Sequence, residues 1–174
     1  MSIVLNYSPQ EKLVEISLPS SKSISNRLLI AQALAEGKFE LNNLSEAQDT
    51  KVLIYALTSN AQTIDIGMAG TAFRFLTAYF SLQDGVKILT GDSRMKQRPI
   101  AILVDQLKGL GADIQYLEKK GFPPLEITGK TKLKGGKLSI NAGVSSQYIS
   151  ALMLVSPHLS GGLQLSLEGE IVSS

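Results

Sequence analysis

Hydrophobic and polar positions repeat one layout three times along the chain. Each copy starts with a short polar cluster, continues as an apolar helical stretch, turns at a glycine and then enters a strand. We expect the helices at 24–35, 72–82 and 148–155, and the strands at 38–41, 86–89 and 163–167. Because self-similarity of this kind marks an internal repeat, the pattern predicts three related α/β units.

A second helix is expected after each of the first two copies. Asp49 begins one of these helices and is expected to cap it, whereas Pro99 begins the other as a first-turn proline and Gly111 is placed to end it. An alternating strand pair at 113–117 and 124–128 follows the second of these helices. The unit is therefore predicted to be βαβαββ or a permutation of it.

The two ends of the chain differ from this unit. The third copy stops at 169–174, where its second helix is expected, so the chain looks truncated. Near the start, residues 14–18 alternate as another strand before the first polar cluster. We expect residues 1–20 to be a strand segment that could belong with a missing second domain, and residues 21–174 to be an incomplete N-terminal domain.

Composition excludes several classes of function. The 174 residues, 44% of them hydrophobic, suffice for one substantial core, and a net charge of +2 does not indicate a nucleic-acid or membrane partner. Cysteine is absent and His158 is the only histidine, which argues against disulfides, thiolate metal sites and a Ser-His-Asp triad. We expect a cytoplasmic protein without a leader sequence, metal or organic cofactor, and no catalytic role for His158.

The polar clusters lie where helices start, so free backbone N–H groups and the positive ends of helix dipoles face whatever is in front of them. Lys22 lies in the first cluster, and Ser23 and Arg27 are four residues apart on one helical face, an arrangement that fits a phosphate. The alternative is that Ser21, Ser23 and Ser25 are ordinary caps and that Lys22 and Arg27 form a solvated face.

Four motifs, in order, resemble the enolpyruvylshikimate-phosphate synthase family. They are Lys-Ser-Ile-Ser-Asn-Arg at 22–27, Ala-Gly-Thr-Ala-Phe-Arg at 69–74, Leu-Thr-Gly-Asp-Ser-Arg-Met-Lys-Gln-Arg-Pro at 89–99 and Ser-Ser-Gln at 145–147. The resemblance implies an enolpyruvyl transferase fold, mixed α/β, with repeated βαβαββ units around a pseudo-threefold axis. Met68, where the family usually has asparagine, departs from the pattern.

The resemblance also implies roles for individual residues. Those implied to hold shikimate 3-phosphate are Lys22, Ser23, Arg27, Ser145, Ser146, Gln147 and Ser173. Those implied to hold phosphoenolpyruvate are Lys22, Gly70, Arg98 and Gln147. Lys22 and Arg98 are implied to be catalytic by preorganised electrostatics. Arg74, Arg94 and Lys96 are expected to be solvated or structural.

The implied reaction belongs to the shikimate pathway to chorismate and the aromatic amino acids, and the family is the target of glyphosate. The enolpyruvyl group of phosphoenolpyruvate moves to the 5-hydroxyl of shikimate 3-phosphate, and phosphate leaves without a cofactor. In the family the proton-transfer carboxylates come from a second domain, so we expect this fragment alone to be inactive.

Two alternatives remain open from the sequence. The related transferase that acts on UDP-N-acetylglucosamine shares the repeat, although its opening motif differs from the one seen here and it commonly uses a loop cysteine. A non-catalytic anion-binding or RNA-binding module could also be built from this unit, although the weak net charge and the lack of a basic-aromatic stripe count against RNA.

Overall fold

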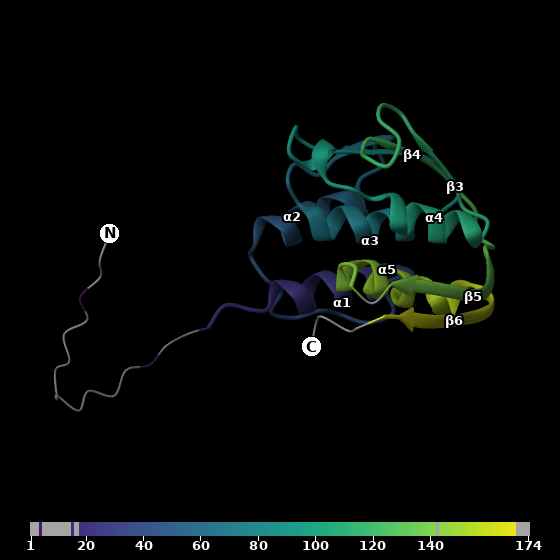
Figure 1. Ribbon diagram of the computed structural model, residues 1–174. Coiled ribbons are helices and arrows are strands. Elements are labelled where there is room, and N and C mark those ends of the chain that lie inside the picture. Colours follow the sequence, from purple (N-terminus) through teal and green to yellow (C-terminus); the bar gives the residue numbers. More distant parts are fainter. Residues whose placement is uncertain (1–3, 5–14, 16–17, 142, 170–174) are drawn as a thin grey trace.

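The chain was analysed as a computed structural model, which describes residues 4, 15, 18–141 and 143–169 (Figure 1). Its α-helices are α1 (Lys22–Leu34), α2 (Gln48–Thr58), α3 (Gly70–Phe80), α4 (Ala101–Gly109) and α5 (Ser146–Val155). Its strands are β1 (Thr63–Asp65), β2 (Gly85–Thr90), β3 (Asp113–Tyr116), β4 (Leu125–Gly129), β5 (Lys134–Asn141) and β6 (Ser160–Glu168). Two short 3-10 helices, η1 (Met95–Gln97) and η2 (Ser156–His158), complete these elements. The expected strand at 14–18 falls mostly outside the described residues, and Ser173 falls outside them entirely.

Helix α1 shows how local sequence sets the boundaries of an element. The Ser21 hydroxyl accepts a hydrogen bond from the Ile24 amide at 3.4 Å, which satisfies one of the free N–H groups of the first turn. At the other end Glu36 and Gly37 both adopt positive φ, 54° and 71°, and the Gly37 amide returns to the Gln32 carbonyl at 2.9 Å. The helix therefore ends through a left-handed cap, as the Glu-Gly pair predicts.

The second repeat forms the complete predicted unit. Its sheet has the strand order β1-β2-β4-β3, in which β1 and β2 are parallel and the other pairs are antiparallel. Helix α3 connects the two parallel strands, and α4 leads into the hairpin of β3 and β4. The expected βαβαββ order is confirmed for this copy.

The third repeat starts in the same way as the second. Strands β5 and β6 pair in parallel and form a separate two-stranded sheet, with α5 as the connection between them. Helices α1, α3 and α5 contact one another in pairs. Figure 1 shows the result as two layers of helices, with α2, α3 and α4 beside the four-stranded sheet and α1 and α5 beside β5 and β6.

The first repeat corrects the sequence analysis. No strand forms at 38–41, where the Phe39 carbonyl instead accepts a hydrogen bond from the Gln32 side chain of α1 at 2.6 Å. No strand pair follows α2 either, because only residues 59–62 separate it from β1. A strand is stable only when a neighbour satisfies its backbone groups, and within the described residues none pairs with this segment.

Two helix starts also differ from expectation. Asp49 lies in the first turn of α2, but Ala47 is the cap residue and no side chain caps that helix. Pro99 precedes α4 instead of opening it, since the helix starts at Ala101 after Ile100. The φ that proline fixes is compatible with several positions at or just before a helix start. A proline therefore predicts the first residue of a helix only to within one or two positions.

Helix α3 forms the centre of the core. Nine of its residues are buried: Gly70, Thr71, Ala72, Phe73, Phe75, Leu76, Thr77, Ala78 and Phe80. A helix with so many buried residues has to be covered on most of its surface, and the two layers in Figure 1 provide that cover. Among the described residues, no helix is both long and apolar enough to span a membrane.

We predict that Leu152→Ala in α5 will lower the free energy of unfolding by about 2–5 kcal/mol, because Leu152 is fully buried and its removal leaves a cavity. Met153→Ala is the matched control, since that side chain is 60% exposed and its loss should change stability by less than about 0.5 kcal/mol. Urea unfolding of both variants measures the difference, and equal losses would contradict the described packing of α5.

Candidate functional site

Helices α1, α3 and α5 begin at the same end of the molecule. Gln147, in the first turn of α5, contacts Thr71 and Arg74 in the first two turns of α3. Arg27, in the second turn of α1, contacts Ser150 of α5 and lies 5.6 Å from the ring centre of Phe75 in α3. None of the three helices carries an acidic residue in its first turn, so their positive dipole ends are not neutralised locally.

The start of α1 contributes two cationic side chains to this region. The Lys22 ammonium lies 3.7 Å from a carboxylate oxygen of Asp49 in α2. The Arg27 guanidinium donates one hydrogen bond to the Ser23 carbonyl and another to the Ser150 hydroxyl, each at 3.0 Å. Arg27 is therefore fixed in place by contacts within α1 and from α5, and the remaining N–H groups of its guanidinium can still bind a ligand.

Gly70 and Arg98 meet at the start of α3. A Cβ atom built on Gly70 would overlap the guanidinium of Arg98 and would lie 3.0 Å from that of Arg74. The absence of a side chain at Gly70 is thus what allows Arg98 to approach the helix start. No side chain caps α3, so the amide groups of its first turn have no side-chain partner and are available to an anion. Gly70 and Thr71 in this turn are buried.

Gln147 is held by a network that the sequence did not predict. Its side-chain oxygen accepts a hydrogen bond from Arg74 at 2.9 Å, and its side-chain nitrogen donates to the Thr71 hydroxyl at 3.0 Å. Arg74 also donates to the Gly70 carbonyl at 2.9 Å. The sequence could have indicated the contact between Gly70 and Arg74, because residues four apart on one helix share a face.

Ser145 and Ser146 lie beside this network at the start of α5. Ser145 is the cap residue of the helix, and its hydroxyl accepts a hydrogen bond from the Gln147 amide at 3.4 Å. Ser146 is the first helical residue and is exposed. The structure thus brings the predicted motifs at 22–27, 69–74, 89–99 and 145–147 to one region.

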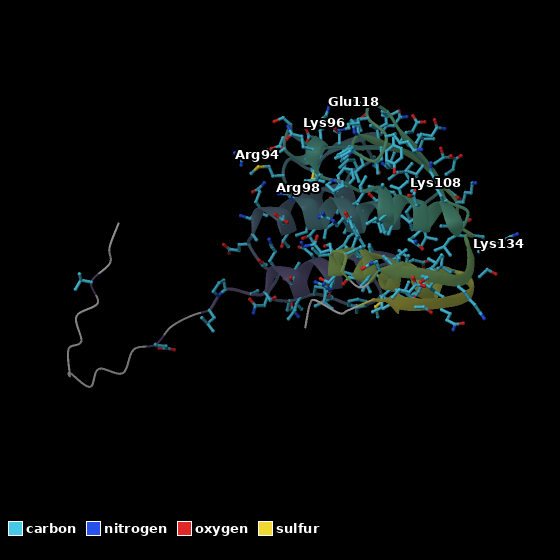
Figure 2. All side chains as sticks on the ribbon, viewed as in Figure 1. Arg94, Lys96, Arg98, Lys108, Glu118 and Lys134 are labelled. Atoms are coloured by element: carbon cyan, nitrogen blue, oxygen red, sulfur yellow. The ribbon has the colours of Figure 1, made fainter. Side chains whose placement is uncertain are left out.

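The positive charge of this region has few neutralising partners. Within the part of the chain that the structure describes, no carboxylate pairs with Arg27, Arg74 or Arg98. Lys96 differs from them, because its ammonium pairs with Glu118 at 2.6 Å and both lie in the upper part of Figure 2. Arg74 and Arg98 lie together beside Gly70, and Arg27 lies between α1 and α5, so the helix starts carry positive charge that attracts an anion.

Titratable groups other than the arginines lie both near the helix starts and away from them. Asp49, Asp65 and Asp92 line a hollow beside Ala69, the residue that precedes α3. His158 approaches the Leu34 carbonyl at 3.1 Å, at the opposite ends of α5 and α1. Burial raises the pKa of Tyr79 and of Tyr116, and the charge of Asp105 adds to the rise at Tyr116. Among the described residues there is also no cluster of three side chains suited to a metal ion.

Comparison with known proteins identifies similar chains. The family model described as EPSP synthase (3-phosphoshikimate 1-carboxyvinyltransferase) matches residues 8–59 and 52–174. A 3-phosphoshikimate 1-carboxyvinyltransferase of Bacteroides fragilis is 54% identical over 165 residues, which are 95% of this chain and 40% of the relative. An enzyme of the same name from Shewanella piezotolerans is 41% identical over 196 aligned positions, which cover 97% of this chain and 46% of the relative.

A solved structure of EPSP synthase from Acinetobacter baumannii superposes with a TM-score of 0.72 at 26% identity. The superposition covers 81% of this chain and 37% of the solved chain. The chain spans about 40% of the length of the Bacteroides fragilis relatives.

The alignments also show a difference in length between this chain and some relatives. The Shewanella alignment has 196 positions, so it includes residues of the relative that have no counterpart in this chain of 174 residues. The Bacteroides alignment has 165 positions. The two family matches meet at residues 52–59, the end of α2. This is the place where the chain lacks the strand pair that follows α4 in the second repeat.

We predict that Gly70→Ala will displace the Arg98 side chain while changing the free energy of unfolding by less than about 1 kcal/mol. The added methyl group meets the tip of a flexible side chain, which can move at little cost. The Arg98 Nε–H signal in NMR spectra should shift strongly. Gly109→Ala is the matched control, because its Cβ would make only an ordinary contact, 3.8 Å from Leu138. An unchanged Arg98 signal in Gly70→Ala would contradict the geometry.

Proposed function

Because this chain belongs to the EPSP synthase (3-phosphoshikimate 1-carboxyvinyltransferase) family, we propose that it provides the N-terminal half of that enzyme's active site. In this reaction the enolpyruvyl group of phosphoenolpyruvate moves to the 5-hydroxyl of shikimate 3-phosphate, and phosphate is released. The observation that carries the proposal is the group of arginines at the starts of α1, α3 and α5. Arg27, Arg74 and Arg98 pair with no carboxylate among the residues that the structure describes. Both substrates are anions with a phosphate and a carboxylate.

Shikimate 3-phosphate is assigned to the starts of α1 and α5. The residues in this assignment are Lys22, Ser23, Arg27, Ser145, Ser146 and Gln147, with Ser173 beyond the described part of the chain. The position of Arg27 between the two helices supports the assignment, since one guanidinium can bind a carboxylate in a two-pronged manner. The serine hydroxyls and the backbone amides of the helix starts provide neutral hydrogen-bond donors for the other oxygen atoms of shikimate 3-phosphate.

Phosphoenolpyruvate is assigned to Gly70 and Arg98, with Lys22 and Gln147 facing both substrates. The uncapped start of α3 and the approach of Arg98 to it support this assignment. The 5-hydroxyl loses its proton and its oxygen adds to the enol carbon as the methylene carbon is protonated to a methyl group. Phosphate then leaves as the methyl group loses a proton, which restores the double bond. Lys22 and Arg98 stabilise the anionic oxygens through fixed positive charge, a form of catalysis that needs no covalent bond to the protein.

Asp49 has a supporting role in this proposal. Its carboxylate lies near the Lys22 ammonium, and its side chain is 25% exposed whereas that of Lys22 is 48% exposed. At a separation of 3.7 Å the pair restrains the lysine while leaving other ammonium N–H groups free for substrate. The sequence analysis expected a helix cap at this position, so the role of Asp49 comes from the tertiary structure.

The proposal includes the organisation of the complete enzyme. Residues 1–20 are assigned to a second domain, and residues 21–174 to the N-terminal domain. The second domain is expected to supply the groups that transfer protons and to close over phosphoenolpyruvate. We place the enzyme in the cytoplasm, where phosphorylated metabolites are retained.

The proposal is tested by NMR titration of this chain with shikimate 3-phosphate. We expect saturable shifts of backbone amides at Ser23, Arg27 and Ser145–Gln147, and smaller shifts at β3 and β4. UDP-N-acetylglucosamine at the same concentrations is the matched control, because the related transferase would respond to it. A response to the UDP-sugar alone, or shifts spread over the lysine-rich surface that disappear with salt, would refute the assignment.

A second prediction concerns Ser150, whose hydroxyl holds Arg27 at 3.0 Å. Ser150→Ala should weaken shikimate 3-phosphate binding about 3- to 10-fold, because one hydrogen bond to a charged group is lost and the guanidinium gains freedom. Ser150→Thr retains a hydroxyl and should bind within about twofold of the original chain. Ser156→Ala, near the other end of α5, is a further control, and binding losses equal to those of Ser150→Ala would contradict the role of Ser150.

A further inference from the structure

Tyr148 joins α5 to the segment that carries Arg98. It follows Gln147 in the first turn of α5 and is only 5% exposed. Its hydroxyl donates a hydrogen bond to the Pro99 carbonyl at 2.6 Å. Proline has no backbone N–H, so this carbonyl is the single main-chain group through which Pro99 can be held by hydrogen bonding.

The Ile100 carbonyl accepts the first hydrogen bond of α4, from the Val104 amide, and the segment from Arg98 to Ile100 has two further main-chain anchors. The Arg98 amide donates to the Met95 carbonyl at 3.0 Å, and the Ile100 amide donates to the Gly121 carbonyl at 2.9 Å. Both of these bonds lead to η1 and to the loop between β3 and β4. Among the hydrogen bonds of this segment, the bond from Tyr148 is the one that fixes it relative to α5.

The ring of Tyr148 has a separate contact. The Arg74 guanidinium lies over it, 5.1 Å from the ring centre, and the same guanidinium bonds to Gly70 and Gln147. A phenylalanine at this position would keep the ring and this contact. Packing and the contact with Arg74 therefore account for the ring, and only the hydrogen bond to Pro99 accounts for the hydroxyl.

We propose that the Tyr148 hydroxyl is a positioning group which, through the Pro99 carbonyl, holds Arg98 beside Gly70 without touching either substrate. The consequence for phosphoenolpyruvate rests on the proposed function, whereas the position of Arg98 can be measured without any ligand. The physical reason is preorganisation. Arg98 is exposed and its long side chain has many rotamers, so binding is weakened unless the backbone that carries it is already fixed.

The bond also relates the two substrate assignments to each other. Gln147 and Tyr148 are neighbours, so α5 orients one residue for shikimate 3-phosphate and, through Pro99, another for phosphoenolpyruvate. Removing the hydroxyl should therefore affect the two ligands unequally. Arg98 should lose its fixed position, while Gln147 keeps its bonds to Arg74 and Thr71.

The test compares Tyr148→Phe with the unmodified chain. Without ligand, nuclear Overhauser contacts between the Arg98 side chain and Gly70 should weaken, and the Arg98 Nε–H should become more mobile in relaxation measurements. In NMR titrations, phosphoenolpyruvate should bind about 3- to 10-fold more weakly, and shikimate 3-phosphate should stay within about twofold. Tyr79→Phe is the matched control, since that residue lies in the last turn of α3 away from the helix starts.

The outcomes separate this inference from the proposed function. Unchanged Arg98 contacts and unchanged phosphoenolpyruvate affinity in Tyr148→Phe would overturn the inference. Equal weakening of both ligands together with a lower urea midpoint would also overturn it, because it would show a general structural role. If the unmodified chain binds neither ligand but Arg98 still loosens in Tyr148→Phe, the positioning role stands and the proposed function fails.

Discussion

The burial of α3 on most of its surface is the constraint on which the rest of the structure depends. A helix with so many buried residues needs cover from the four-stranded sheet on one side and from α1 and α5 on the other. That cover fixes the three repeat helices side by side, with Phe75 and Thr71 of α3 in contact with Arg27 and Gln147. The location of the site at the helix starts is therefore a consequence of core packing.

This packing gathers arginines that pair with no carboxylate in the described part of the chain. Arg27, Arg74 and Arg98 come from different parts of the sequence, and each is held by hydrogen bonds or close contacts to neutral groups. Like charges at close range repel, and the positive ends of helices add to the repulsion. An anionic ligand would relieve this repulsion, so the same arrangement that costs stability in the free chain favours the binding of an anion.

The repeats show how a common unit can be shortened without losing the site. The second repeat has both its parallel strand pair and its hairpin, whereas α2 of the first repeat leads almost directly into β1. The absence of a strand pair after α2 does not affect the helix starts. That position follows the end of α2, whereas Asp49, which contacts Lys22, lies in its first turn.

Local sequence determined the repeat, the polar starts of α1, α3 and α5, the hairpin of β3 and β4, and the motifs that identify the family. These features depend on periodicity and on residue types at turns and caps, which act over a few residues. Tertiary structure alone decided that 38–41 is not a strand, that Asp49 pairs with Lys22, and that Arg74 holds Gln147. It also placed the Tyr148 hydroxyl on Pro99. Contacts of this kind join residues far apart in the chain, so they exist only after the helices have packed.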